Sequence, residues 1–181
     1  MSQGTRRNLV MALEAGVAPE IAPWLWALGD ARRRTLDGLA GLSPATLDRT
    51  PPAGGNSIGT LLYHIALIEA DWLLAEVLEL SEFPPEVLDL FPLDVRDVGG
   101  QLTPCVGLDL AAHLARLDAT RARLLATFRT MALDEFRRTR QLPAYDVTPE
   151  WVLHHLLQHE AEHRGEIGLI RALAKQAGID Q

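Results

Sequence analysis

Four long stretches of this 181-residue chain carry apolar residues at three- and four-residue steps, and they constrain the fold more than any other feature. The stretches run from about residue 19 or 23 to 41, from 56 or 57 to 80, from 109 to 130 and from 148 to 176. Steps of three and four place side chains on one face of an α-helix, whereas no segment shows the sustained alternation of a half-buried strand. The sequence therefore predicts an all-α fold, a bundle of four helices.

Small polar residues, prolines and glycines mark where these helices begin and what connects them. Either Asn56 or Ser57 is suited to cap the second helical stretch, and Thr148 the fourth, because their side chains can accept hydrogen bonds from free backbone N–H groups. Ser43 followed by Pro44 predicts a short extra helical turn. Four prolines and three glycines lie in residues 81–107, which predicts a long crossover between the second and third helices with at most short turns. A connection of this length can shape the mouth of a site.

Length and composition favour one domain. Because 48% of the residues are hydrophobic, the chain can bury one ordinary core, and we expect a single helical-bundle domain over residues 1–181 with residues 1–18 as a short N-terminal extension. The net charge of −7 argues against binding of nucleic acid, since phosphate contacts need clustered basic residues, and we expect Arg32-Arg33-Arg34 to form a solvated face. No apolar run approaches the ~20 residues that span a bilayer, so we expect a cytoplasmic protein with no membrane partner.

Two histidines stand in the apolar stripe of the fourth helix. At ~100° per residue, His159 and His163 fall on one stripe, whereas His155 lies on its flank and His154 on the opposite face. Each neutral imidazole has one donor and one acceptor, so two inward rings without partners would be costly. Hydrogen-bonded core histidines are the alternative, but two consecutive stripe members four residues apart favour ligands of one divalent metal. The stripe consists of Val152, Leu156, His159, His163, Ile167, Ile170 and Ala174.

A third ligand has to come from another helix. His64, on the apolar side of the second helix, is the best candidate, and His113 on the third helix is the reserve choice. Glu166, near the edge of the histidine stripe, can orient a ligand by accepting a hydrogen bond from its second ring nitrogen. Glu69 lies in an apolar row and either plays the same part or reaches solvent at a helix crossing. Arg121 interrupts the third apolar stripe; we expect it to extend to the surface, the alternatives being a charged partner or an anionic substrate inside.

Two familiar motifs share these residues. His159-Glu160-x-x-His163 matches the HExxH motif of zinc peptidases, in which the glutamate is the general base. Glu160, however, lies about 80° away from the histidine stripe, and there is no convincing strand to hold an extended peptide. Glu160-x-x-His163 also fits half of a di-iron carboxylate bundle, but no other helix contains a second such motif. Both interpretations are weaker than a three-histidine site.

Two blocks of the sequence resemble the DinB-like (YfiT/DinB) superfamily of metal-binding four-helix bundles. The first block runs from Pro51 to Ile65 and is followed by Glu69 and Trp72; it resembles the loop that enters the family's ligand-bearing helix. The second block, His155 to Ile167, resembles the family's His-x3-His-Arg-Gly signature. Spacing and helix order match over roughly residues 20–175.

This resemblance has implications for the site and for function. It implies that His64, His159 and His163 hold zinc, nickel or a similar divalent ion, with open positions for water or substrate. It also implies an unusual bundle topology and frequent homodimers. Several relatives are thiol S-transferases that use bacillithiol, mycothiol or glutathione-like thiols, including mycothiol-dependent maleylpyruvate isomerases.

The chemistry expected of such a site follows from its ligands. Neutral imidazoles leave the metal its full positive charge, so a thiol or water in an open position would lose its proton near neutral pH. We therefore hypothesise a thiol S-transferase, or a related hydrolase, in which a metal-bound thiolate or water attacks a small electrophile. The single cysteine, Cys105, cannot form an intramolecular disulfide and is not required. The main alternative is a non-catalytic, stress-associated metal-binding bundle; a DNA-associated damage protein conflicts with the acidic charge.

Overall fold

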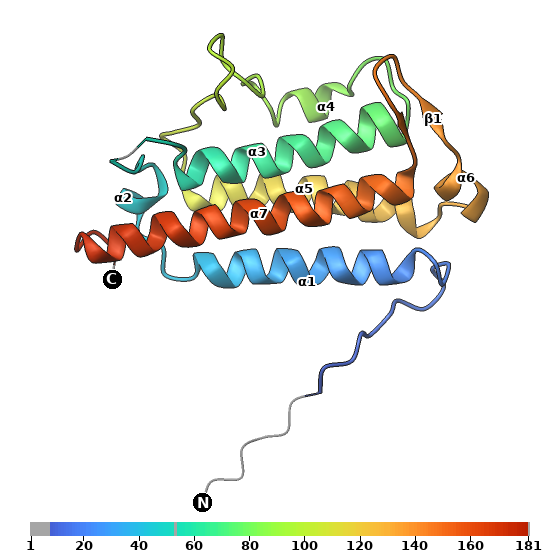
Figure 1. Cartoon of the computed structure of the whole chain (residues 1–181), viewed down its shortest axis with the longest axis horizontal. Helices are drawn as coiled ribbons and strands as arrows, with labels where there is room; N and C mark the ends of the chain where they lie inside the picture. The colour runs from blue at the N-terminus through green and yellow to red at the C-terminus, as the bar shows by residue number, and fades with distance from the viewer. Residues whose placement is uncertain (1–7, 53, 181) are drawn as a thin grey trace, which may run out of the picture.

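The computed structural model describes residues 8–52 and 54–180. Residues 1–7 of the expected N-terminal extension, Ala53 in the first family-like block and Gln181 lie outside the described residues. Residues 8–14 have no regular secondary structure and lead away from the helices (Figure 1). Their last residue is attached to the bundle, because the Glu14 carboxylate accepts a hydrogen bond of 2.8 Å from the Arg129 guanidinium.

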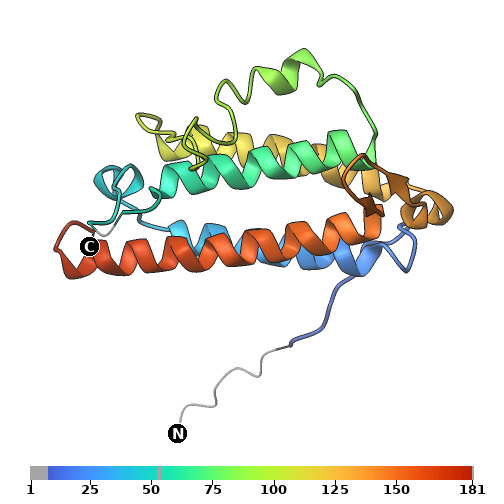
Figure 2. The same ribbon diagram turned by 45° about the horizontal axis from the view of Figure 1, so that its top comes forward.

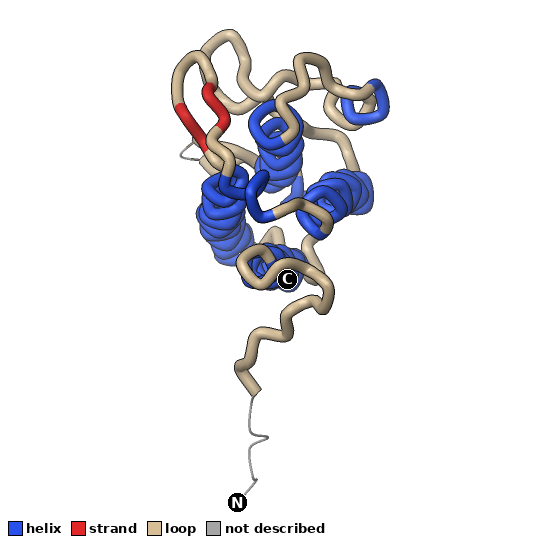
Figure 3. The backbone as a smooth tube through the Cα atoms, turned by 90° about the vertical axis from the view of Figure 1, so that its right-hand side faces the viewer, coloured by secondary structure: helices blue, strands red, loops and turns tan. Residues whose placement is uncertain are grey.

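Four long helices surround a common core. Figures 2 and 3 show from two further directions that the long helices lie side by side. Short helices occur between them and are α2 (Pro44–Leu47), α4 (Pro85–Leu88) and α6 (Leu133–Arg137). The predicted all-α, four-helix bundle is therefore confirmed. The long helices are α1 (Ala22–Leu39), α3 (Ile58–Asp71), α5 (Leu110–Arg129) and α7 (Pro149–Gln176).

Side-chain caps begin the helices where the sequence predicts them. Ser43, Ser57 and Thr148 each use a side-chain oxygen to accept a hydrogen bond from the backbone N–H three residues further on. Asp109 caps α5 in the same way. Each cap satisfies a donor that the first helical turn leaves free, which fixes the residue at which each helix starts.

The second long helix changes its winding at its C-terminal end. After Asp71 the chain continues as a π-helix, η1 (Trp72–Val77), in place of the regular helix predicted up to about residue 80. A π-helical turn is wider than an α-helical one and often occurs at functional sites. It begins at Trp72, a residue that lines two cavities described below.

The segment from α3 to α7 contains two irregular connections. Residues 78–109 form the predicted crossover, which contains α4 and a single bridge between Arg96 and Leu102. A second connection holds a small antiparallel ribbon of β1 (Arg140–Gln141) and β2 (Asp146–Val147). The sequence did not predict this ribbon, because strands of two residues are too short to show an alternating pattern. The ribbon lies beside the beginning of α7 (Figure 1).

One helix is apolar enough to resemble a membrane span. Ile58–Val77 covers 20 residues with a mean hydropathy of 1.4, so the expectation that no apolar run reaches this length is wrong. Within its most apolar window, 78% of the residues are buried inside the bundle. Burial against α5 and α7 accounts for this composition, because a helix that contacts several neighbours needs a broad apolar surface. Ile58–Val77 is thus the core helix of a soluble bundle.

A layer of four charged side chains, one from each long helix, lies between the two largest apolar clusters of the core. One cluster is centred on Leu28, Leu124 and Leu156, and the other on Leu61 and Ile167. All four residues are at most 6% exposed. They are Arg32, Glu69, Arg121 and Glu160.

Candidate metal centre

Three histidine rings from two helices meet at one point beside the charged layer. The Nε2 atom of His159 lies 3.1 Å from Nε2 of His64 and 3.1 Å from Nε2 of His163. One ligand atom from each ring lies within 4.8 Å of the other two. The structure thus brings together the three residues that the sequence predicts as ligands, His64 from α3 and the other two from α7.

The spacing of the nitrogen atoms suits a divalent metal. Imidazole nitrogens bind zinc at about 2.0–2.1 Å, which places two ligands of a tetrahedral site about 3.3 Å apart. The two separations of 3.1 Å between Nε2 atoms are close to this value. In addition, the buried Nδ1 atoms of His64 and His163 have no well-aligned hydrogen-bond partner among the described residues. The two 3.1 Å contacts between Nε2 atoms can be hydrogen bonds between the rings, but they leave these two Nδ1 atoms without a partner.

The surroundings keep the rings of His64 and His159 in the uncharged form that can bind a metal. Burial, together with the neighbouring imidazole of His163, lowers the pKa of His64 to about 4. Burial and the rings of His163 and His64 lower the pKa of His159 to about 3. Both rings are therefore neutral at pH 7, and their nitrogen lone pairs are available without loss of a proton.

The two glutamates expected to orient the ligands have different positions. Glu166 lies one helical turn after His163, and its Oε1 is 3.3 Å from Nδ1 of that ring, although the angle does not make a good hydrogen bond. Glu69 neither contacts a histidine nor reaches solvent; its oxygens accept hydrogen bonds of 2.7 Å from Arg121 and 3.0 Å from Arg32. The expected role of Glu69 is corrected accordingly: it belongs to the charged layer.

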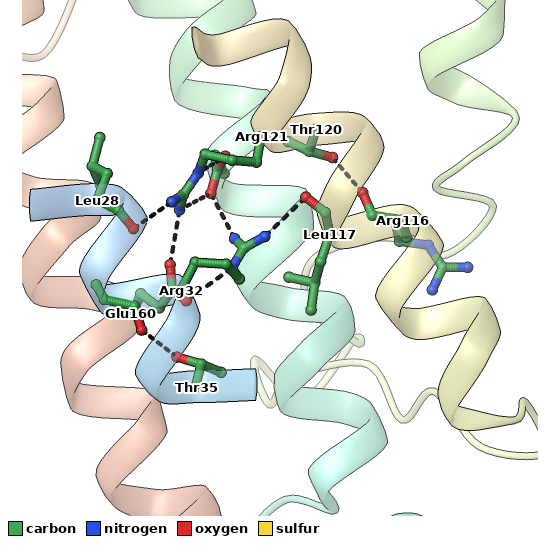
Figure 4. A network of polar contacts seen from close by, with 10 residues as sticks. Leu28, Arg32, Thr35, Arg116, Leu117, Thr120, Arg121 and Glu160 are labelled. Carbon is green, nitrogen blue, oxygen red and sulfur yellow. Dashed lines mark hydrogen bonds and ion pairs between the residues drawn. The ribbon is translucent and has the colours of Figure 1, made fainter. Parts of the chain in front are cut away.

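The expectation that Arg121 extends to the surface is wrong, because its guanidinium lies inside the bundle. It donates 2.7 Å hydrogen bonds to both oxygens of Glu69 and to the backbone oxygen of Leu28, and a 2.8 Å bond to Glu160 (Figure 4). Burial alone would lower the pKa of Arg121, but attraction to Glu69 and Glu160 outweighs burial and raises it. Because its hydrogen bonds are made within the bundle and its side chain is only 8% exposed, Arg121 is not placed to bind a substrate.

Glu160 closes the charged layer from α7. Its Oε1 accepts a 2.9 Å hydrogen bond from Arg32, and its Oε2 accepts one from Arg121. Burial tends to raise the pKa of Glu160, but the two arginines lower it below its ordinary value. A buried carboxylate paired in this way cannot act as a general base beside the histidines, so the peptidase interpretation of HExxH does not fit the structure.

The remaining histidines lie outside the cluster. His113, the reserve ligand, is fully buried in α5 against Gly59, and burial lowers its pKa to about 4. His155 packs its ring against both Trp72 and Trp151, with ring centroids 4.6 and 5.2 Å away. His154 faces Trp24 on the other side of α7. His155 still borders the metal centre, since its centroid is 5.8 Å from that of His159.

The histidines open onto a cavity of about 430 Å³. The long connection provides part of the wall, as expected from its length. A larger cavity of about 680 Å³ adjoins the first, and Trp72 lines both. The smaller cavity is lined by Asn56, His64, Ile68, Trp72, Arg96, Gln101, Leu102, His155, His159 and His163.

Three residues of this region were not singled out as functional from the sequence. Arg32 is buried, whereas its neighbours Arg33 and Arg34 form the expected solvated face. Its position four residues after Leu28 in the apolar stripe of α1 was the available signal. Arg96 lines the cavity from the crossover, and Trp72 lines it from the π-helix. No periodic sequence pattern predicts the conformation of either segment.

Comparison with known proteins agrees with this fold. The profile of the DinB superfamily matches residues 27–167, whereas no curated protein matches the chain. Among solved structures, the chain is similar to YfiT from Bacillus subtilis, described as a probable metal-dependent hydrolase with an unusual four-helix bundle topology. The two share 17% sequence identity and a TM-score of 0.63 over 92% of this chain and 93% of YfiT. The family match covers most of the sequence, and the chain belongs to the DinB superfamily.

Proposed function

We propose that this protein is a metal-dependent enzyme in which His64, His159 and His163 hold a divalent ion, zinc or nickel, for attack on a small electrophile. The observation that carries the proposal is the pair of 3.1 Å separations between ring nitrogens at the wall of a 430 Å³ cavity. The description of YfiT as a metal-dependent hydrolase supports the same type of site.

The number of ligands favours catalysis over a structural role. Among the described residues, no fourth histidine, cysteine or carboxylate joins the cluster of His64, His159 and His163. Structural zinc sites are usually closed by four protein ligands, whereas catalytic sites keep a position for water or substrate. Here the side without a protein ligand faces the cavity, where a small molecule can enter.

A bound metal would supply positive charge that lowers the pKa of a coordinated thiol or water. The chain itself contributes three imidazoles, a polar wall and, among the described residues that line the cavity, one arginine. Arg96 lies on the exposed edge of the cavity, and Asn56 and Gln101 offer amide donors and acceptors. These groups suit a hydrophilic molecule with a carboxylate, and they hold it beside the histidines.

We infer that the nucleophile is the sulfur of a low-molecular-weight thiol. The chain has one cysteine, Cys105, which is 2% exposed and whose pKa is raised by burial, so the sulfur has to come from a cosubstrate. In the transfer, the thiol sulfur forms a bond to the electrophilic carbon, and the leaving group departs with the electrons of the broken bond. The thiol proton passes to solvent.

Hydrolysis is the second candidate, and the description of YfiT favours it. Water would take the place of the thiol, and the same three histidines and the same cavity would serve. The two candidates differ in one measurable respect, the requirement for a thiol.

The test measures turnover of 1-chloro-2,4-dinitrobenzene with bacillithiol, mycothiol and glutathione, and of 4-nitrophenyl acetate without thiol. We expect turnover that depends on both thiol and metal, that His64→Ala abolishes and that His154→Ala retains. His154 is a matched control because it lies in the same bundle but faces Trp24. Metal-dependent turnover without thiol would refute S-transfer in favour of hydrolysis. Equal turnover by His64→Ala and the unaltered protein would refute the site.

A further inference from the structure

The larger cavity, of about 680 Å³, is a candidate binding site in its own right. It lies where η1, the β1–β2 ribbon and the beginning of α7 meet, and Trp72 forms its boundary with the histidine cavity. We call it the aromatic cavity. It is lined by Trp72, Thr139, Tyr145, Asp146, Val147, Thr148 and Trp151.

Flat rings dominate its wall. The rings of Trp72 and Tyr145 are stacked at 27°, with centroids 5.9 Å apart, and Trp72 also packs against Trp151 at 5.4 Å. Trp151 and Tyr145 are nevertheless 47% and 44% exposed. These rings line a concave site and remain open to water. Such a site suits a planar apolar group, because binding of that group buries the exposed aromatic surface.

The ring of His155 lies next to both Trp72 of the aromatic cavity and His159 of the metal centre. The centroid of His155 is 4.6 Å from that of Trp72 and 5.8 Å from that of His159. A ring that rests on Trp72 is therefore close enough for an attached group to reach the three histidines. One molecule can occupy both cavities, with its ring in one and its reacting carbon in the other.

The charges around the aromatic cavity restrict the kind of ring. Among the described residues that line it, none is lysine or arginine, and Asp146 is acidic. Glu76 lies buried behind Tyr145, whose hydroxyl donates a 2.8 Å hydrogen bond to Oε1 of Glu76. Oε2 has no hydrogen-bond partner in the part of the chain that the structure describes. Thr139 and Thr148 add only neutral hydroxyls. An anionic ring would meet these carboxylates without a compensating cation.

We propose that the aromatic cavity binds the uncharged or cationic aromatic ring of the substrate, so that the enzyme acts on aryl-bearing electrophiles. The assignment of the ring to a substrate rests on the proposed function. Binding of the ring itself does not rest on the proposed function, because none of Trp72, Tyr145 and Trp151 is a candidate metal ligand. The two claims can therefore fail separately.

The binding test uses isothermal titration calorimetry of the full chain, with and without a chelator, and two probes: neutral 2-naphthol and anionic naphthalene-2-sulfonate. We expect 2-naphthol to bind in both conditions and the sulfonate to bind at least tenfold more weakly. Trp151→Ala should weaken 2-naphthol at least tenfold, and Trp151→Phe should restore most of the affinity. Trp24→Ala, which removes a tryptophan on the other side of α7, should leave the affinity for 2-naphthol unchanged.

The outcomes separate this inference from the proposed function. Equal affinity for 2-naphthol in Trp151→Ala and the unaltered protein, with both shown to be folded by circular dichroism, would overturn the aromatic site. Equal affinity for the two probes would overturn the preference for an uncharged ring. If Trp151-dependent binding is found but metal-dependent turnover is not, the aromatic site is supported and the proposed function is refuted. With turnover, Trp151→Ala should raise KM for an aryl substrate and leave kcat nearly unchanged.

Discussion

The Nε2 atom of His159 lies 3.1 Å from Nε2 of His64, across 95 positions of sequence. Each of these histidines is followed closely on its own helix by a glutamate of the charged layer, Glu160 directly and Glu69 after one turn. Arg32 and Arg121 bind both glutamates from the other two helices. The charged layer therefore fixes the rotation of α3 and α7, and with it the direction in which the histidines point.

Glu160→Gln should strongly destabilise the bundle. The substitution leaves two buried arginines with a single carboxylate, and the loss of one partner from a buried ion pair costs about 3–5 kcal/mol. The free energy of unfolding, measured by urea denaturation of metal-free protein, should fall by this amount. As a control, Arg123→Met breaks an exposed pair with Glu86 and should cost at most about 1 kcal/mol. Equal losses in the two variants would contradict the role given to the charged layer.

Gly59→Ala tests close packing between α3 and the segment before α5. A Cβ atom at Gly59 would lie 3.1 Å from the backbone oxygen of Cys105 and 3.2 Å from both Asp48 Oδ1 and His113 Nε2. Because backbone atoms cannot yield easily, the substitution should lower the free energy of unfolding by about 1–3 kcal/mol. At Gly168, an exposed helical position in α7, a Cβ meets nothing within 4 Å, so alanine should stabilise by up to ~1 kcal/mol. Stabilisation by both substitutions would refute the close contact.

His113 should make stability depend on pH. Burial lowers its pKa from 6.5 to about 4, so between these values the unfolded chain takes up a proton that the folded protein does not. The contribution is constant above pH 6.5 and is lost as the pH falls to 4, by roughly 3 kcal/mol. In chelator, the unaltered protein should therefore lose more stability from pH 7.5 to 4.5 than His113→Gln. His64 and His159 are present in both proteins, so their titration cancels; parallel pH curves would contradict the prediction.

Glu166→Gln should weaken metal binding without removing it. Glu166 Oε1 lies 3.3 Å from His163 Nδ1, and a carboxylate in this position stabilises the ring orientation that a ligand needs. Loss of such a partner typically costs 10- to 100-fold in metal affinity, which competition with a chromophoric chelator would measure. Glu162→Gln removes the same charge from an exposed position of α7 and should change affinity less than threefold. An equal change in both variants would show that only net charge matters.

The sequence predicted what periodicity and capping determine. Ser57, Asp109 and Thr148 begin their helices at the predicted positions because a cap is a local interaction. The spacing of His159 and His163 predicted their common direction for the same reason. Helical phase also placed Glu160 away from the histidines, as the structure has it.

Other features depend on contacts between helices and could not be predicted in this way. An arginine in an apolar stripe can extend either to solvent or to a buried partner. Arg121 stays inside the bundle because Glu69 and Glu160, on two other helices, lie within hydrogen-bond distance of it. The cavity walls depend on the crossover and on the β1–β2 ribbon, which lack a repeating pattern. Tertiary packing, not local preference, determines both.

The most direct measurement is the metal content of the purified protein and of single alanine variants at the three histidines, by inductively coupled plasma mass spectrometry. The account predicts about one divalent ion per unaltered chain. It predicts loss of that ion, or at least a hundredfold weaker binding, in His64→Ala, His159→Ala and His163→Ala, with full occupancy in His154→Ala. Undiminished stoichiometric metal in His64→Ala and His159→Ala would contradict the three-histidine centre.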